Sequence, residues 1–310
     1  GLLSHPSRYE RRDRPMEKTV STPTSRARSI RRGTFSFKGF LEALPFLLPA
    51  LFFYGTFILY PMISAIRLSF FEWNGFATVE KVFVGWENYT KVLFHDPVFW
   101  TAAKNSVIWM VLTLLFPTIL GLVFAVVLNQ KLPGRYIFRT ILYLPSVLAP
   151  IAVATMWRWM YNPNFGIINF ALQSIGLGGL IQPWLASAKT ALYAIFVAST
   201  WVVTGLNMVL FLAGLQNIPK ELTEAAHVDG ANPLQVFWNI TIPTLRPTFI
   251  IVFALTIINS LKVFDLVVGM TNGGPAQSTQ VLALWSYFQS FGNHDFGSGN
   301  AIATILLGIS

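Results

Sequence analysis

Long apolar stretches alternate with polar loops along most of the chain. A helix needs about 20 residues, at about 1.5 Å each, to cross the roughly 30 Å hydrocarbon core of a bilayer. Five stretches reach that length, at residues 44–66, 107–128, 141–160, 191–215 and 249–270. A sixth begins near Gly299 and has 12 residues up to and including Ser310, so we expect a last span without its C-terminal part or a short re-entrant segment. The pattern predicts an all-α, polytopic membrane protein.

Composition supports a bilayer rather than water as the solvent of this chain. Hydrophobic residues make up 54% of the 310 residues and charged residues 11%, whereas soluble domains carry about 25% charged residues. The chain has no Cys and four scattered His, which excludes disulfides and thiolate chemistry and leaves no spacing typical of a metal site. We therefore expect no catalytic residues and no metal site.

The N-terminal segment 1–38 differs from the rest of the chain. It holds 10 of the 22 Lys and Arg residues against three acids, with almost no apolar clustering, which is typical of disordered chain. We expect a disordered basic tail there and a transmembrane domain over 39–310. The remaining 12 bases and 10 acids form no basic stripe, so nucleic acid is not an expected partner.

Charge in the loops predicts the orientation, because Lys and Arg near span ends stay on the cytoplasmic side. Loop 129–140 contains Lys131, Arg135 and Arg139 and no acid, so we place it inside together with the tail. Loops 69–103 and 162–190 are balanced or nearly uncharged and are placed outside. Alternation then puts loop 216–248 inside and 271–298 outside, with the N-terminus in the cytoplasm.

Aromatic residues and one short segment agree with this orientation. Trp and Tyr gather at the outward span ends, as in an interfacial belt, at Trp73, Trp86, Trp100, Trp157, Trp159, Tyr161 and Trp184. Segment 279–291 is too short and too polar to span. Its spaced Leu, Trp and Phe residues predict a helix lying in the outer interface.

The inside loop 216–248 has strong helix signals. Pro219 and the acids that follow it favour a helix over about 220–229, and Gly230 is a natural residue just beyond its end. Pro233 prevents continuation, and a second helix is expected to end before Pro243. The small Ala225 and its neighbour would let the first helix seat closely in a groove of a partner protein.

A spaced pattern runs through this loop, E-A-A-x3-G-x9-I-x-L-P with Ile in place of Leu. It resembles the cytoplasmic loop of membrane subunits of binding-protein-dependent ABC importers, with their six-helix type I core; the matching positions are Glu224, Ala225, Ala226, Gly230, Ile240, Ile242 and Pro243. A chance helix-turn-helix linker is the alternative. The resemblance implies a coupling helix that docks on the nucleotide-binding subunit, with Glu224 and Asp229 as polar contacts.

A second stretch, from Asn259 to Pro275 and followed by Thr279, is similar to carbohydrate importer permeases of the maltose and glycerol-phosphate type. The similarity extends to Tyr60-Pro61, Ser69-Phe70, residues 85–89 and Asn105, and so covers nearly everything after residue 40. It implies a sugar or small oligosaccharide as cargo and the cytoplasmic (inner) membrane of a prokaryote as location. The implied partners are a second homologous permease, a dimer of ABC ATPases, an extracytoplasmic solute-binding protein and the lipid bilayer.

The chain itself lacks the Gly-rich GxxxxGK[ST] loop that cradles nucleotide phosphates. We therefore expect no enzymatic activity and no cofactor bound by this chain. Under the resemblance, ATP and Mg²⁺ belong to the partner ATPase.

Polar residues within predicted spans mark candidate positions on the substrate pathway. Lys262 and Asp265 are the only opposite charges inside one span, three residues apart on one predicted helical face, and Asn259 would join them. They would line the sugar pathway or form an internal ion pair that orients the helix. Thr204 and Asn207 would line the pathway or serve as hydrogen bonds between helices.

Three further alternatives concern the cargo, the class of transporter and one turn. Glycerol-3-phosphate or a related polyol phosphate is the alternative candidate for the cargo. Lys262 is the only base deep in a predicted span, which favours a neutral cargo over this anionic one. An ion-coupled secondary transporter using Lys262 and Asp265 is the alternative of another class. The Gly273-Gly274-Pro275 turn either ends the helix or shapes the outer mouth.

Overall fold

The computed structural model describes residues 37–310, with side chains from residue 44 onward, and divides them at Tyr54 into two units. Most of the expected tail 1–38 lies outside the described residues. The first unit ends with helix α1 (Phe37–Tyr54), which contains Pro45 and Pro49. The second unit, Gly55–Ser310, is described by itself below.

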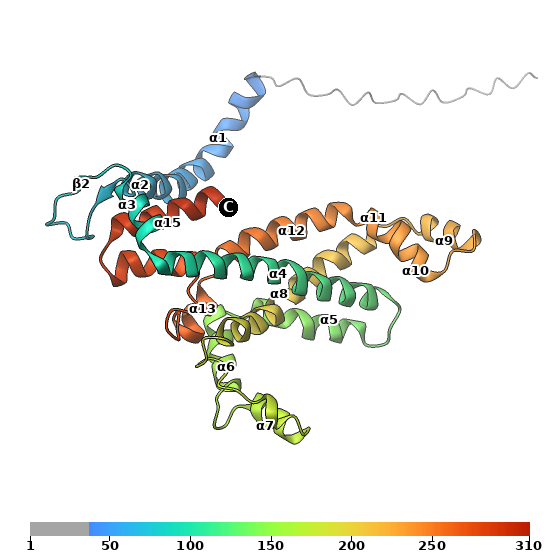
Figure 1. Ribbon diagram of the computed structural model, residues 1–310. Helices are drawn as coiled ribbons and strands as arrows, with labels where there is room; N and C mark the ends of the chain where they lie inside the picture. The colour runs from blue at the N-terminus through green and yellow to red at the C-terminus, as the bar shows by residue number, and fades with distance from the viewer. Residues whose placement is uncertain (1–36) are drawn as a thin grey trace, which may run out of the picture. The chain divides into compact units, whose positions relative to one another are not determined.

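Nearly all of the regular secondary structure of the second unit is helical (Figure 1). The one sheet is a two-residue antiparallel pair of β1 (Phe71–Glu72) and β2 (Val82–Phe83). The helices are α2 (Tyr60–Leu68), α3 (Glu87–Thr90), α4 (Pro97–Asn129), α5 (Arg135–Tyr143), α6 (Pro150–Met160), α7 (Ile167–Ser174), α8 (Ala191–Gln216), α9 (Lys220–Val228), α10 (Pro233–Val236), α11 (Ile242–Thr244), α12 (Arg246–Leu261), α13 (Asp265–Thr271), α14 (Leu282–Tyr287) and α15 (Phe296–Ile309).

Three helices of the described residues are long and apolar enough to cross a membrane, namely residues Leu44–Leu68, Pro97–Asn129 and Ala191–Gln216. Two bent pairs bring the number to five if each pair is one span, and α15 is a shorter apolar helix. The predicted spans 44–66, 107–128 and 191–215 are therefore confirmed as helices. The second begins ten residues earlier than predicted, because Asp96 caps the helix and Pro97 suits its first position.

The predicted span 141–160 is wrong as one continuous helix. The chain forms α5 and a 3₁₀ turn (Leu144–Val147), then bends by 102° before α6. Pro145 and Pro150 flank the bend, and a proline removes a backbone donor and disfavours helical geometry in the residue before it. The sequence thus carries the local signal for this break.

The predicted span 249–270 is also broken. Helix α12 ends at Leu261, and α13 starts at Asp265 after a non-helical link. At Phe264 the backbone has φ −145° and ψ −60°, outside the helical region. Asn272 and Gly273 then take positive φ and end α13.

Buried side chains form three clusters in the described residues. One includes Trp109, Ile195 and Val267, between α4, α8 and α13. The second lies around Phe211 and Leu245 at one end of α4 and α8. In the third, Leu282, Trp285 and Ile302 pack with Phe99 at the other end of the molecule.

The aromatic belt and the interfacial helix differ in part from expectation. Trp86, Trp100 and Trp159 are exposed, as a belt requires, but Trp157 and Tyr161 are buried in the first cluster. Helix α14 leaves Tyr287 exposed and packs its other face on α15 and α4. Its buried residues are Leu282, Leu284 and Trp285, so its apolar side chains face the protein core.

Loops lie at two ends of the second unit, and the segment that contains α7 projects from its side (Figure 1). Both predicted inside loops lie at one end, where Asn129 and Gln130 line a notch together with His227 and Pro233. We call this the inner end. The segments 69–103 and 271–298 meet at the opposite, outer end, for example where Lys91 contacts Asp295.

Candidate functional site

Helix α9 at the inner end contains the first part of the predicted coupling pattern. It spans Lys220–Val228, as the sequence predicts, with Pro219 before it. Its C-terminus forms a Schellman motif, in which Ala231 N–H donates to the Ala226 carbonyl and Gly230 N–H to the His227 carbonyl. Gly230 has φ +81°, which a residue with a Cβ rarely adopts.

The second half of the loop is helical as well. Asn232 caps α10 in a reciprocal capping box with Gln235. A π-helical turn (Phe237–Thr241) carries Ile240, and α11 follows. The expectation that this helix ends before Pro243 is wrong, because the helical run from Pro233 continues through Pro243 to Thr244. A bend of 64° then separates α11 from α12.

The loop exposes a helix and buries its base. Glu224, Ala225, Asp229 and Gly230 are exposed, and Val228 is 88% exposed. Val236 and Leu245 are buried against the inner ends of α4 and α8. Sequence reasoning missed these two anchors, because single apolar residues in a loop do not reveal what they pack on.

Glycines let α8 approach its neighbours closely. A Cβ at Gly214 would overlap Thr248 and Leu245 at the base of the loop, and one at Gly205 would overlap the Leu142 backbone of α5. A Cβ at Gly121 of α4 would meet Asn207. These contacts make α4, α5 and α8 one packed body on which the loop rests.

The predicted pathway residues divide into two groups. Asn207 and Asn259 line one cleft of about 170 Å³ between α4, α8 and α12, together with the hydroxyls of Thr113, Ser146, Ser199, Thr256 and Ser260. Asn207 is 3% exposed, and its amide nitrogen has no partner. Thr204 lies elsewhere, in an apolar cleft of about 690 Å³, and its hydroxyl donates to the Thr200 carbonyl of its own helix.

Lys262 and Asp265 do not share a helical face. Lys262 follows the last residue of α12, and Asp265 is the first residue of α13. Both side chains are exposed, and the only ion pair within residues 44–310 joins two other residues. The interpretation as an internal ion pair is therefore wrong, because the break in the helix separates the two charges.

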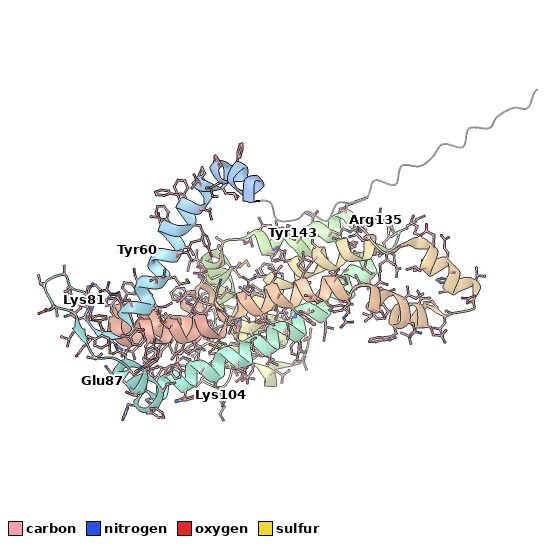
Figure 2. All side chains as sticks on the ribbon, turned by 90° about the horizontal axis from the view of Figure 1, so that it is seen from above. Tyr60, Lys81, Glu87, Lys104, Arg135 and Tyr143 are labelled. Carbon is pink, nitrogen blue, oxygen red and sulfur yellow. The ribbon has the colours of Figure 1, made fainter. Side chains whose placement is uncertain are left out.

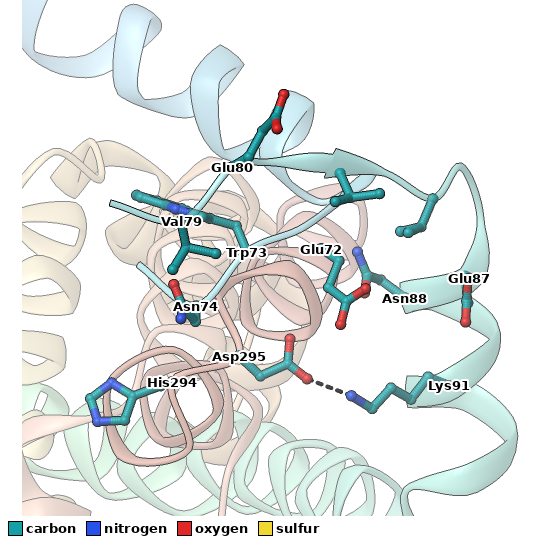
Figure 3. A pocket seen from close by; sticks show the side chains of 12 residues that line it. Glu72, Trp73, Asn74, Val79, Glu80, Glu87, Asn88, Lys91, His294 and Asp295 are labelled. Carbon is teal, nitrogen blue, oxygen red and sulfur yellow. Dashed lines mark hydrogen bonds and ion pairs between the residues drawn. The ribbon is translucent and has the colours of Figure 1, made fainter. Parts of the chain in front are cut away.

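A pocket also lies at the outer end of the second unit. A pocket of about 520 Å³ is lined by the carboxylates of Glu72, Glu80, Glu87 and Asp295, and the ion pair between Asp295 and Lys91 crosses it at 2.6 Å (Figure 3). Burial alone would raise the pKa of Asp295. Hydrogen bonds from Lys91 and from the backbone and hydroxyl of Ser298 outweigh that effect and hold the pKa below its ordinary value.

These features define a class of protein. Broken and unbroken apolar helices surround a cleft in which hydroxyl and carboxamide groups lie among apolar side chains. An exposed helix pair projects from one end, and the whole is as expected of a membrane transport subunit. Solved structures share this fold: an alginate ABC transporter, crystallised with a periplasmic protein bound to alginate pentasaccharide, matches 88% of this chain and 91% of its own at a TM-score of 0.75 and 22% identity.

The sequence comparison identifies the family. Residues 91–310 match the family described as binding-protein-dependent transport system inner membrane component, and the chain belongs to it. It is 38% identical to a probable ABC transporter permease of Pyrococcus horikoshii over 262 residues, covering 84% of this chain and 89% of that one. It is 36% identical to the trehalose/maltose transport system permease of Thermococcus litoralis, covering 88% and 90%.

Family membership has direct consequences for the predictions. The protein is a permease subunit of an ABC importer and lies in the inner membrane as a multi-pass protein that works with a binding protein. ATP hydrolysis resides in a separate subunit, so the permease is not itself an enzyme. The ion-coupled secondary transporter, which the sequence left as an alternative, is a different class of transporter from this family.

Proposed function

We propose that this permease imports a neutral sugar or small oligosaccharide. The observation that carries the proposal is the cleft around Asn207 and Asn259, which offers hydroxyl and carboxamide groups and no charged residue. Carboxamides and hydroxyls match the donors and acceptors of a sugar, and the amide nitrogen of Asn207 has a hydrogen bond left to donate. Relatives named for trehalose/maltose, for multiple sugars and for arabinooligosaccharides support the same cargo.

Lys262, Asp265 and Asn259 would complete the pathway on a surface that this chain leaves exposed. Charged groups in a membrane-spanning region face a bundle interior or water rather than lipid. Their exposure supports a second, homologous permease subunit that closes the pathway on that side. Thr204 is a weaker candidate, because its hydroxyl is satisfied within its own helix.

The loop at the inner end would dock on a dimer of ABC ATPases that bind ATP and Mg²⁺. Its exposed helix presents Glu224 and Asp229, and its base is fixed by Val236 and Leu245. Movement of the ATPases would therefore pass to α4, α8 and α12 as movement of a rigid body. This assignment makes the inner end cytoplasmic, in agreement with the bases of loop 129–140, and would place the N-terminus in the cytoplasm.

Coupling is tested in the complex reconstituted with its ATPase and binding protein. Glu224→Lys and Gly230→Val should abolish sugar-driven uptake and weaken assembly with the ATPase, while membrane insertion persists. Asn217→Lys puts the same charge at the same end outside the pattern and should leave uptake unchanged. Full uptake in both pattern variants would contradict the coupling assignment.

The cargo is tested by measuring ATPase stimulation with candidate ligands of the binding protein. A neutral disaccharide or oligosaccharide should stimulate, and Asn207→Leu should remove the stimulation while assembly is kept. Stimulation by glycerol-3-phosphate in place of sugars would favour the polyol phosphate alternative instead.

A further inference from the structure

Three basic residues lie close together at the inner end without any acidic partner. Lys131 precedes α5, while Arg135 and Arg139 are one turn apart on it. Within the side chains described, from residue 44 on, none of the three makes an ion pair. A cluster of bases without carboxylates leaves its positive charge available to an anion.

Arg139 has a structural role of its own. Its Nη2 donates to the Leu128 carbonyl at 2.6 Å, one of the carbonyls that the C-terminus of α4 leaves without a helical donor. Its Nε is buried and has no partner. Arg139 thus holds α5 against the end of α4 and fixes the cluster between two membrane-spanning segments.

Aromatic contacts keep the cluster together. The guanidinium of Arg135 lies 5.1 Å from the ring centre of Tyr136, and that of Arg139 lies 5.6 Å from the same ring. Arg135 also donates to the Tyr136 hydroxyl at 3.2 Å. The ring therefore holds both guanidinium groups on one side of α5 without neutralising them.

Most of the other side chains of α5 are apolar and exposed, while Leu142 packs towards α8. Tyr136, Ile137, Phe138 and Ile141 are between 55% and 67% exposed. Helix α5 is the first part of a bent span, and Figure 2 shows Arg135 at its inner end and Tyr143 towards the middle of the protein. Bases at the membrane boundary with exposed apolar side chains deeper along the same helix match the two parts of a phospholipid, a charged headgroup and its acyl chains.

We propose that Lys131 and Arg135 bind the headgroup of an anionic phospholipid of the inner leaflet, at the surface beside the inner end of α5. The assignment to the inner leaflet rests on the orientation proposed above. Arg139 positions α5, and Ile137, Phe138 and Ile141 contact the acyl chains. Basic pockets between helices on the cytoplasmic side are suited to such headgroups.

The test uses the full chain in detergent, titrated with phosphatidylglycerol or phosphatidylcholine and followed by native mass spectrometry. The wild-type chain should retain phosphatidylglycerol more strongly. The double variant Lys131→Gln/Arg135→Gln should bind it about 30-fold more weakly, since each base near the headgroup contributes a factor of about five. Binding of phosphatidylcholine should not change.

Two matched variants separate charge from structure. Lys131→Arg/Arg135→Lys keeps both charges and should retain affinity within about threefold. Lys104→Gln removes an exposed base in the outer part of α4 (Figure 2) and should have no effect. Equal affinity of the double Gln variant and wild type would overturn the proposal, as would equal competition by free glycerol phosphate, which would show a site for soluble anions.

The orientation of the chain in the membrane is checked in a separate labelling experiment. A single introduced Cys can be used for it, because the chain has no native Cys. Gln130→Cys in sealed vesicles should react with an impermeant maleimide only from the cytoplasmic side. Labelling from the outside would refute the proposed orientation and therefore the assignment of the lipid to the inner leaflet. The lipid affinity measured in detergent would still test whether Lys131 and Arg135 bind the headgroup. An effect of the bases seen only with the ATPase present would overturn the lipid as their partner.

Discussion

The outer end of this permease and the loop at its inner end differ in the side-chain hydrogen bonds that stabilise them. At the outer end, side chains connect segments that are far apart in the sequence: Lys91 with Asp295, Asp96 with Trp285, and Asn105 with the carbonyls of Ser278 and Gln280. In the loop at the inner end, side-chain hydrogen bonds join residues three or four apart, as in Thr223 with Lys220 and Asn232 with Gln235.

The difference indicates which end tolerates change. A helix pair that is stabilised locally keeps its shape when it moves or when its surface is altered, as a docking element requires. The outer end loses stability when any one long-range partner is removed, because its segments have few local reasons to stay together. The predictions below test this contrast, from the largest expected loss of stability to the smallest.

Asn105 should be the most sensitive position at the outer end. Its amide donates to two carbonyls at 2.8 Å each, and the residue is 7% exposed. Asn105→Ala would leave both carbonyls without a donor and should cost about 2–4 kcal/mol. The measurement is thermal unfolding of the purified chain in detergent. A loss of stability as small as that of a typical surface substitution would contradict the proposed difference between the two ends.

Asp96 should come next, because one carboxylate serves two segments. Its Oδ1 caps α4 through Val98 and Phe99, and its Oδ2 accepts from the Trp285 indole at 2.6 Å. Gln289 Nε2 also donates to Oδ2, at 3.2 Å. Asp96→Ala should cost about 2 kcal/mol or more, because it removes the cap and both hydrogen bonds to the carboxylate. Trp285→Phe removes the second contribution together with part of a buried ring, so its loss should be about as large in the same unfolding assay.

Substitution of Asp295 should lower the stability by less than the two substitutions above, and by an amount that depends on pH. Lys91 is 61% exposed, so solvent weakens the ion pair, and Asp295→Asn should cost about 1 kcal/mol at neutral pH. The native pKa of Asp295 lies below its ordinary value of 3.8. Its contribution is therefore present above that value and is lost as the pH falls through the lower native pKa.

Thermal unfolding of wild type and Asp295→Asn at stepped pH measures this contribution. The gap between their unfolding temperatures should be constant down to about pH 5 and should close under stronger acid. Lys91→Gln, which leaves the α15 cap intact, should reproduce most of the gap at neutral pH. A gap that persists in strong acid would show that the charge of Asp295 is not its cause.

Glu224 should show the smallest effect on stability. It is exposed on α9, and its side chain makes no hydrogen bond or ion pair within residues 44–310, so Glu224→Lys should change stability by less than about 0.5 kcal/mol. Uptake by the reconstituted complex should nevertheless be lost under the proposed coupling. A large drop in unfolding temperature would show that the inner loop is not stabilised locally.

Features with a local physical cause could be predicted from the sequence. The length of an apolar run determines a span, and Pro219, Gly230 and Asn232 determine where the helices of the inner loop begin and end, because caps and turns act over a few residues. The bends at Pro145 and Pro150 belong to the same class. Their signal was present in the sequence, although length alone predicted one continuous span.

Features that depend on distant partners were decided by the tertiary structure. The sequence near residue 262 contains no residue typical of a helix end, although α12 ends there. The spacing of Lys262 and Asp265 therefore predicted a shared helical face that the folded chain does not have. Nor does the sequence of α14 reveal that it packs on α15 and α4. Local propensity acts on neighbouring residues, whereas burial depends on which segments meet, and only the folded chain brings Asn105 to Ser278, or Arg139 to the end of α4.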